Sequence, residues 1–303
     1  GVINDVTYYY AVFSRDTAVN WNDSVTAGQN ADTGVSLSFP SVLKAFYTFN
    51  EGTGTVANDS SGTGNTGVIN GAAGTTGKSG GGLSFDGIND YVEASHSNSL
   101  NITDNKITLS AWVYYVDNEN HQIIIAKPYS STTHASPYFS YCLHVLNGVG
   151  TTDGTPRFWL TINGVGKYAT SSVKIAQNQW NHITGVYDGA TTMKIYINGV
   201  LRGTTSVTGN VTGYNTPLRV GTNGGLTQVW KGILDDVSIY NKALSDQEVQ
   251  DLYTQYTPPS QVADFTASDS QYAKITLDWT NPSDTDLAEV VVQRKEGSYP
   301  AGH

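Results

Sequence analysis

The feature that most constrains this chain is the spacing of its apolar residues, which recur at every second position in short runs. Clear examples are residues 107–115, 140–146 and 180–187. Successive side chains of a strand point to opposite faces, so this alternation indicates β-strands with one buried face. The 32 glycines fall largely in the turns between the runs. The sequence therefore predicts an all-β fold with many turns.

Two local signals add detail to this prediction. Asn198-Gly199 separates two strand-like runs, and Asn-Gly is the strongest short hairpin signal. Residues 245–253 form the one segment that looks helical. Ser245 is a suitable N-cap, and Glu248 three residues later completes a capping box.

Charge and composition exclude several classes of partner. The formal net charge of −10 disfavours binding to nucleic acid. No run approaches the ~20 apolar residues of a membrane span. Cys142 is the only cysteine, so we expect no intrachain disulfide and interpret it as a small strand residue. The chain begins at Gly1 without a signal peptide, which predicts a processed product or a piece of a longer protein.

Four separated motifs in the middle of the chain carry a family resemblance. They are residues 46–54 with 58–67, residues 83–92, residues 107–113, and residues 232–240 with 243–245. In this order they resemble the laminin-G-like family of concanavalin A-type jelly rolls. The resemblance implies a two-sheet jelly roll over residues 33–256. It implies little about activity, because one fold hosts many functions.

The two ends of the chain resemble complementary parts of a fibronectin type III domain. Residues 1–32 look like strands F and G, with Val2, Asp5 and Tyr8 at the spacing of the tyrosine corner. Residues 257–303 follow a linker that contains Pro258-Pro259, and they look like strands A to C. The residues that we expect to join the two halves are Tyr8, Tyr10, Val12, Ile275, Leu277 and Trp279.

Complementary halves allow two arrangements. The chain is either an excerpt of a tandem array, or the tail of one copy receives the head strands of the next. Head-to-tail contacts of the second kind propagate into a filament when the rotation does not close. The sequence leaves open whether the halves pair within one polypeptide or between subunits.

Catalysis is not expected from this chain. Hydrolases of the resembling fold class that cut polysaccharides carry a Glu-x-Asp-x-Glu pattern on one strand, and no such pattern occurs here. The histidines show no metal-binding spacing. His121, His134 and His144 lie in one region of the sequence, and we interpret them as surface residues.

Calcium is the expected cofactor. Residues 59–65 form a loop rich in oxygen ligands, which suit a hard cation that takes about 6–8 oxygens. The family resemblance implies that a structural calcium ion ties such a loop to an aspartate near the C-terminal strand. The candidate ligands are Asp59, Asn65, Asp86, Asp235 and Asp236. The alternative interpretation is that these residues only form turns.

Sugar binding requires an exposed aromatic platform with polar neighbours. Trp159 alternates with Phe158 and Leu160, which places it on the opposite face of its strand. The other candidates lie in or beside polar loops and are Trp230, Tyr129, Tyr138 and Tyr168. The alternative is that these aromatic rings pack between the sheets or under loops.

These observations lead to two main hypotheses and a weaker one. The first is an extracellular structural or adhesive protein, a repeat unit of a surface array or filament whose partners are copies of itself or adjacent repeats. The alternative is a glycan-binding, lectin-like module of a secreted adhesin or polysaccharide-degrading enzyme. A third is the accessory part of a hydrolase whose catalytic domain lies elsewhere.

Overall fold

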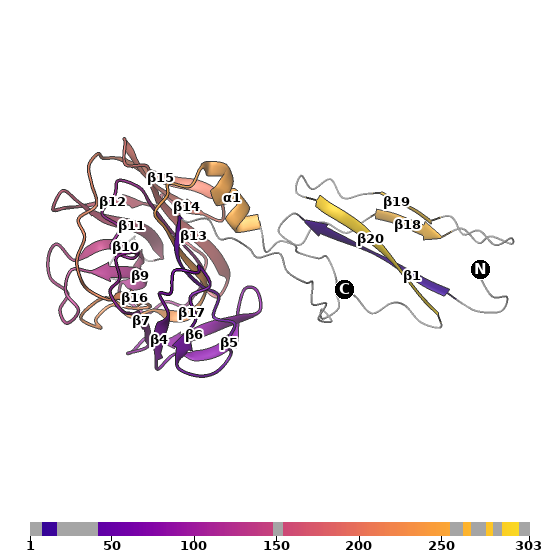
Figure 1. Cartoon of the computed structure of the whole chain (residues 1–303), viewed down its shortest axis with the longest axis horizontal. Coiled ribbons are helices and arrows are strands. Elements are labelled where there is room, and N and C mark those ends of the chain that lie inside the picture. The colour runs from indigo at the N-terminus through magenta and orange to yellow at the C-terminus, as the bar shows by residue number, and fades with distance from the viewer. Residues whose placement is uncertain are drawn as a thin grey trace. The chain divides into compact units, whose positions relative to one another are not determined.

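The chain divides into two compact units. In the computed structural model, residues 42–147 and 154–254 are described with their side chains, and the backbone is described for strands β1 (Tyr8–Asp16), β18 (Ala263–Ala267), β19 (Leu277–Thr280) and β20 (Leu287–Glu296). The jelly-roll unit spans Leu37–Tyr253, and the outer unit combines Gly1–Ser36 with Thr254–His303. Each unit is described by itself below (Figure 1).

The jelly-roll unit consists of two antiparallel sheets of eight strands each (Figure 1). The first sheet has the spatial order β12 (Val165–Thr170), β11 (Thr155–Ile162), β10 (Phe139–Leu146), β9 (Gln122–Pro128), β16 (Leu218–Val220), β7 (Tyr91–Ala94), β4 (Gly67–Asn70), β3 (Val56–Ala57). The second has the order β15 (Val200–Ser206), β14 (Thr192–Ile197), β13 (Trp180–Tyr187), β8 (Ile107–Tyr115), β17 (Lys231–Tyr240), β6 (Gly81–Asp86), β5 (Ala73–Thr76), and β2 (Leu43–Tyr47) pairs with β17. The predicted all-β jelly roll is therefore confirmed.

One hydrophobic core lies between the sheets. It takes alternate residues from each strand, for example Tyr141 and Leu143 from β10, Phe158 and Leu160 from β11, and Leu109 from β8. The alternation read from the sequence thus sets which face of each strand is buried. Burying apolar side chains contributes about 25 cal/mol per Å², so this core dominates the stability of the unit.

The outward faces of the central strands are also covered. Helix α1 (Asp246–Thr254) brings Val249 and its neighbour Leu244 against Val186 and Tyr196 of the second sheet. On the first sheet, Phe139 packs over Cys142 and the neighbouring strand β9. Every residue of β9 and β10 is consequently buried, and Cys142 has no solvent exposure, as predicted for a small strand residue.

Two local predictions are confirmed. Asn198 and Gly199 both adopt positive φ, 52° and 74°, and they join β14 to β15 as a tight hairpin turn requires. At the start of α1, Glu248 N donates to Ser245 Oγ (3.2 Å), and Ser245 N donates to Glu248 Oε2 (2.8 Å). This reciprocal pair is the capping box.

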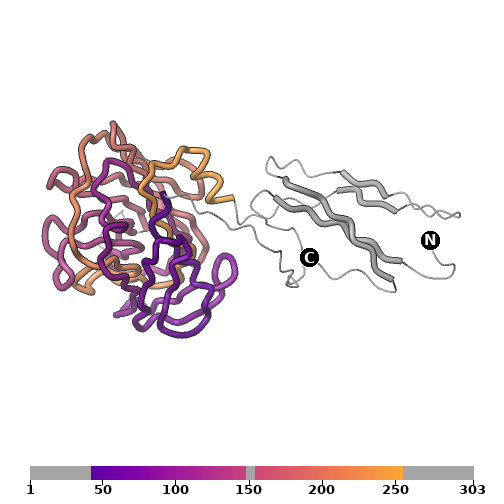
Figure 2. Tube along the Cα trace, in the orientation of Figure 1, coloured from indigo at the N-terminus to yellow at the C-terminus, as the bar shows by residue number. Residues whose placement is uncertain are grey.

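The beginning and end of the jelly-roll unit lie side by side. Strand β2 pairs with β17, with Tyr47 opposite Val237. In Figure 2 the indigo start of the described unit accordingly runs beside its orange end. The first described strand of the unit thus pairs with its last strand, and helix α1 follows.

The outer unit pairs the head of the chain with its tail. β1 runs antiparallel to β20, from Tyr8 opposite Glu296 to Arg15 opposite Glu289, and β18 pairs with β19. Of the expected assembly residues, Tyr8, Tyr10 and Val12 lie on β1 and Leu277 and Trp279 on β19. Ile275, with Val2 and Asp5, lies outside the described residues. The assignment to a fibronectin type III domain stays a prediction.

Among the described residues, no helix has the length and apolar character needed to cross a membrane.

The core leaves no room for a side chain at Gly185 of β13, because an added Cβ would overlap the ring of Phe158. We expect Gly185→Ala to lower the free energy of unfolding by about 1–3 kcal/mol through overpacking. The double variant with Phe158→Leu should lose less free energy of unfolding than the sum of the two single variants, because the Phe158 ring is what the added Cβ would meet. Denaturant unfolding of the full chain measures this coupling, and strictly additive losses would contradict the packing described.

Candidate functional site

Aromatic side chains gather on the outward face of β10, β11 and β12. Trp159 of β11 and Tyr168 of β12 are directly opposite each other in the register. Their rings stack with centroids 5.4 Å apart and an interplanar angle of 22°. Tyr168 is 44% exposed and Trp159 is partly buried. The pair therefore presents aromatic surface to solvent at the edge of the first sheet.

Gly166 explains how the indole lies against its neighbouring strand. A Cβ at this position of β12 would overlap Cζ2 of Trp159. The glycine thus leaves room for the indole to lie close over β12. The short hairpin between β11 and β12, with Asn163 and Gly164 at positive φ, places Gly166 in this position.

The loop between β9 and β10 adds a third ring. Tyr138 contacts Trp159 edge to face, with centroids 6.0 Å apart, and is 36% exposed. Its φ of 72° is strained for a bulky residue. The loop is closed by Tyr129 N, which donates to Tyr138 O (2.7 Å). Backbone strain of this kind is typical of residues that a functional site holds in place.

Arg157 stands beside these rings. Its guanidinium lies over the ring of Tyr168, 4.2 Å from the centroid, and its Nε donates to Thr170 Oγ1 (3.0 Å). Arg157 is on the same face of β11 as Trp159, two residues earlier. The sequence prediction missed this residue, although the alternation that places Trp159 outward places Arg157 there too.

Three histidines continue this face. His144 is the cross-strand partner of Arg157, and its ring stacks on that of His121 with centroids 6.2 Å apart. His134 lies against Tyr138, 4.7 Å between centroids. We call Trp159, Tyr168, Tyr138, Arg157 and the three histidines together the β10–β12 face. The interpretation of the histidines as surface residues is wrong for His144, which is 5% exposed.

Burial disfavours the charged form of these histidines. It lowers the pKa of His144 well below the usual value, and the charges of Arg157, His121 and His134 lower it further. Burial also lowers the pKa of His121 and of His134. Neutral imidazoles offer one donor and one acceptor each, which suits hydrogen bonding to a polar ligand.

Three buried polar atoms on the outward side of β10 and β11 have no hydrogen-bond partner among the described residues: Trp159 Nε1, His144 Nε2 and Ser140 Oγ. Buried polar groups are normally paired, so each of these atoms is unfavourable. Other buried atoms of the described residues share this state, such as His182 Nδ1 and Trp230 Nε1, so it is not specific to this face.

Two of the sequence candidates do not belong to the face. Trp230 is fully buried and packs against Tyr115, with centroids 6.0 Å apart, so the prediction of an exposed platform there is wrong. The physical reason is that Trp230 precedes β17 and its large indole fills the core between the sheets. Tyr129 is 43% exposed, but its ring contacts Tyr214 (5.0 Å) instead of Trp159.

The expected calcium loop is held together by its own residues. Asp59 Oδ1 accepts hydrogen bonds from the backbone N of Phe46 and Ser61, and Oδ2 accepts from Thr63 Oγ1 and Asn65 N, at 2.7–3.0 Å. Burial opposes ionisation of Asp59, but the hydrogen bonds outweigh it and lower the pKa. The Asn65 side chain is likewise bonded on both its oxygen and its nitrogen.

The other candidate ligands also serve the chain itself. Asp235 is fully buried and accepts from Lys78 N (2.7 Å) and Ser79 N (3.1 Å), so it fastens the turn between β5 and β6. Asp236 N donates to the same carboxylate, and Asp86 caps a turn by accepting from Ile88 N. Within residues 42–147 and 154–254, no three or more His, Cys, Asp or Glu residues form a group that could hold a metal ion. These residues do not fit one shared calcium site, and calcium binding stays a prediction.

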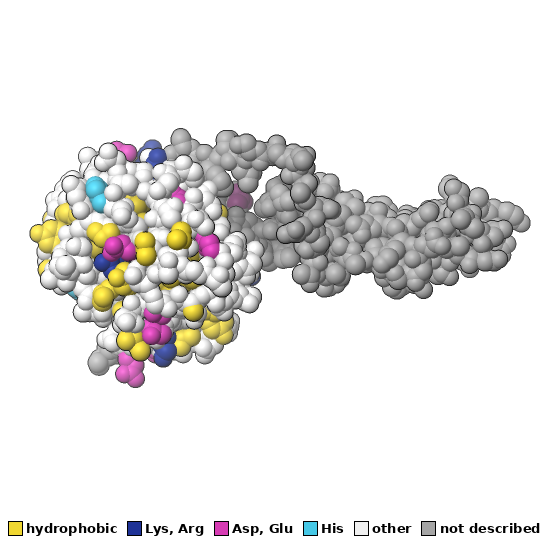
Figure 3. Space-filling view, turned by 60° about the horizontal axis from the view of Figure 1, so that its bottom comes forward, with side chains coloured by type: hydrophobic (Ala, Val, Ile, Leu, Met, Phe, Trp, Pro, Cys, Tyr) yellow, Lys and Arg dark blue, Asp and Glu magenta, His cyan; other side chains and the backbone are white. Residues whose placement is uncertain are grey.

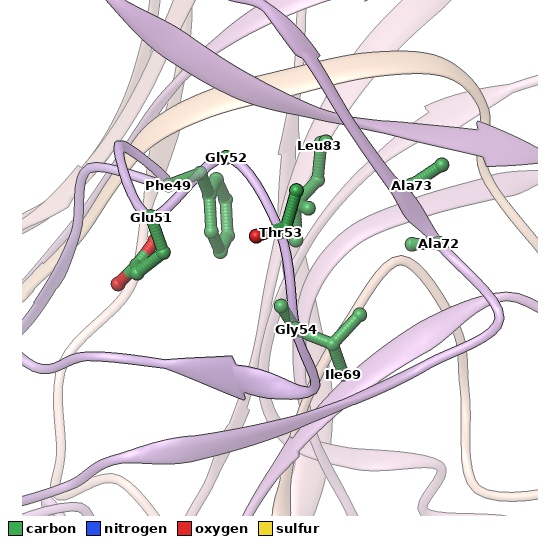
Figure 4. A pocket seen from close by; sticks show the side chains of 10 residues that line it. Phe49, Glu51, Gly52, Thr53, Gly54, Ile69, Ala72, Ala73 and Leu83 are labelled. Carbon is green, nitrogen blue, oxygen red and sulfur yellow. The ribbon is translucent and has the colours of Figure 1, made fainter.

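A separate cleft of about 340 Å³ lies between the loop after β2 and strands β4 to β6. It is lined mainly by apolar or small residues, including Phe49, Ile69 and Leu83 (Figure 4). Figure 4 shows the Glu51 carboxylate pointing away from Leu83. Glu51 and Thr53 are the polar side chains of its lining, which holds no tryptophan, tyrosine or arginine. On the surface seen in Figure 3, apolar side chains occur in small separate groups.

Comparison with known proteins agrees with the fold. The family model Laminin_G_3, described as the concanavalin A-like lectin/glucanases superfamily, matches residues 85–250. This is more than half of the chain, which therefore belongs to that superfamily. Among curated proteins no match was found.

Solved structures resemble the chain at the level of fold. Domain 4 of AbnA, a GH43 extracellular arabinanase from Geobacillus stearothermophilus, in complex with arabinotriose, is 22% identical, with a TM-score of 0.54. The match covers 70% of this chain and 98% of that domain. The binding domain of Paraclostridial Mosquitocidal Protein 1 is 15% identical, with a TM-score of 0.55. The match covers 78% of this chain and 63% of that domain, so the chain spans less than two thirds of the toxin domain.

The loop around Asp59 yields a stability prediction. We expect Asp59→Asn to lower the free energy of unfolding by about 1–3 kcal/mol, because at least one buried backbone N–H loses its acceptor. Asp86→Asn is the matched control. Because Asp86 is exposed, loss of its carboxylate should change the free energy of unfolding little. Addition of EDTA should leave the melting temperature of the wild type unchanged. A clear fall with EDTA that calcium reverses would instead establish the calcium site.

The same carboxylate gives a pH dependence. Because the pKa of Asp59 is lower in the folded state, its stabilising contribution is present above the usual aspartate pKa of about 3.9. It is lost as the pH falls through the folded-state value. The stability difference between the wild type and Asp59→Asn should therefore shrink on acidification.

Proposed function

We propose that this chain is a non-catalytic carbohydrate-binding module and that sugar rings bind to the β10–β12 face. The observation that carries the proposal is the stacked pair of Trp159 and Tyr168, with Tyr138 edge-on beside it. The apolar face of a pyranose or furanose ring packs well on an aromatic ring, and its hydroxyl groups need nearby polar partners. Sites with a few placed polar groups among aromatic side chains are typical of small-ligand binding.

The polar groups are present at the same place. Arg157 supplies guanidinium donors beside Tyr168, and His134 lies beside Tyr138. Stacking surface and hydrogen-bonding groups thus occur together on β11, β12 and the loop before β10.

The similar structures support this proposal. The arabinanase domain was solved with arabinotriose, an oligosaccharide, and the structure of the mosquitocidal protein is named as a binding domain. The likeness extends only to the fold, so the sugar and the surface that binds it are proposals for this chain. We also propose an extracellular location, because the arabinanase is described as extracellular.

A catalytic role has less support. Glycoside hydrolysis needs two carboxyl groups about 5–10 Å apart on either side of the scissile bond. No carboxylate among the described residues makes a ring contact, a hydrogen bond or an ion pair with a member of the β10–β12 face. The module would bind a polysaccharide and leave its cleavage to another protein or domain.

We expect Trp159→Ala to weaken binding to a glycan identified on an array by at least about 10-fold, because central aromatic residues commonly dominate binding energy. Tyr168→Ala should have a similar but smaller effect. Trp180→Ala is the matched control, since Trp180 is also half-buried but lies on β13 of the second sheet and contacts Tyr114. Isothermal titration calorimetry measures these affinities. Equal losses in all three variants, or silence across the array, would refute the proposal.

A structural role in a surface array is the second candidate. It rests on the complementary head and tail, which we propose to form a fibronectin type III-like domain. The antiparallel pairing of β1 with β20 joins head and tail within one chain. Assembly into a filament would require β1 to exchange its partner for β20 of another copy.

Because β1 and β20 of one chain already pair, we expect the purified protein to be a monomer at micromolar concentration. Size-exclusion chromatography with light scattering measures the mass, which is 32.5 kDa for one chain. Electron microscopy of the same sample provides the independent check. Filaments, or a mass that rises steeply with concentration, would favour exchange between copies and the array.

A further inference from the structure

The β10–β12 face differs in charge from the chain as a whole. The sequence holds 26 Asp and Glu residues against 16 Lys and Arg, so carboxylates predominate overall. The ionisable side chains that meet on this face are nevertheless Arg157, His121, His134 and His144, with the weakly acidic Tyr138 and Tyr168. The face thus presents one permanent cation and three imidazoles, and none of these ionisable groups is a carboxylic acid.

Arg157 is held in position without a carboxylate. Its contacts are the ring of Tyr168 and, through Nε, the hydroxyl of Thr170. The ion pairs of the described residues join other partners, such as Arg219 with Glu93 and Lys194 with Asp246. The outer nitrogens of the guanidinium therefore remain oriented by the ring and by Nε, while no acidic residue of the described chain neutralises their charge.

The histidines beside Arg157 do not neutralise its charge. His144 lies directly opposite it on β10, and the positive charge of Arg157 contributes to lowering the pKa of both His144 and His121. The Arg157 side chain is itself partly buried, and burying a cation without a counter-charge costs stability, which lowers its pKa. Violations of local electrostatic rules are expected at functional sites. An anionic ligand would remove this cost.

We propose that the sugar bound by this face carries an anionic group, a carboxylate or a sulfate ester, and that Arg157 binds that group while the sugar ring stacks on Trp159 and Tyr168. This inference rests on the proposed carbohydrate-binding function and adds the chemical class of the ligand. The planar guanidinium matches carboxylate and sulfate oxygens with two parallel hydrogen bonds. Its position on Tyr168 sets the anionic group next to the stacked ring.

The test compares matched acidic and neutral oligosaccharides on the full chain. The probes are trigalacturonic acid against galactotriose, and a sulfated carrageenan tetrasaccharide against its desulfated, neutral form. We expect the wild type to bind one acidic probe at least about 10-fold more tightly than its neutral counterpart at low salt. Which of the two pairs shows the preference distinguishes carboxylate from sulfate. The preference should decline as the salt concentration rises.

Variants of Arg157 separate recognition from a merely structural role. Arg157→Gln should weaken binding of the preferred acidic probe about 10-fold and leave the neutral probe within about 2-fold. Arg157→Lys keeps the positive charge but loses the planar guanidinium with its two parallel donors. Its affinity for the acidic probe should therefore lie between those of the wild type and Arg157→Gln. Lys194→Gln is the control for loss of one positive charge, because Lys194 pairs with Asp246 beside helix α1. Thermal unfolding verifies that each variant is folded.

Each outcome has a separate meaning. Equal binding of acidic and neutral probes, or an equal loss of both in Arg157→Gln, overturns the anionic-sugar inference and leaves the carbohydrate-binding function standing. Absence of binding to every acidic and neutral sugar on an array overturns the function itself, and the inference with it.

Discussion

The alternation of side chains along β11 is the constraint on which both the core and the candidate site depend. Phe158, Leu160 and Ile162 point into the space between the sheets. Because successive residues of a strand face opposite ways, Arg157, Trp159 and Thr161 point outward. A shift of one residue in the register would exchange these sets and bury a guanidinium in the core. The stability of the core thus fixes the position of the residues proposed to bind sugar.

The sequence predicts strand faces better than it predicts loops. Trp159 follows from its apolar neighbours, and the resemblance of the four motifs indicates the jelly roll that the family match confirms. Trp230 was placed in an exposed loop because Gly224 and Gly225 precede it. In the structure, Trp230 N donates to Gly221 O (2.8 Å) and the indole enters the core. Loop paths depend on tertiary packing, which no local pattern encodes.

Clusters of residues from distant segments are likewise hidden in the sequence. His121 precedes β9, His134 lies in the following loop and His144 in β10, and only the folded sheet brings them to Arg157. The acidic candidates show the opposite error. Asp59 and Asp235 look like ligands of one calcium ion by composition, yet each carboxylate accepts hydrogen bonds from nearby backbone N–H groups. Composition alone does not distinguish a carboxylate that holds a loop from one that holds a cation.

Features that are unfavourable for folding occur together on the β10–β12 face. Tyr138 has a positive φ, Trp159 Nε1 and His144 Nε2 lack partners among the described residues, and Arg157 lacks a counter-charge there. Each is tolerable because the large core between the sheets supplies ample stability. A bound anionic sugar would offset the cost of the unneutralised Arg157 charge. Phe49 of the apolar cleft also has a positive φ, 50°, so the unneutralised charge of Arg157 is the feature that distinguishes the β10–β12 face from that cleft.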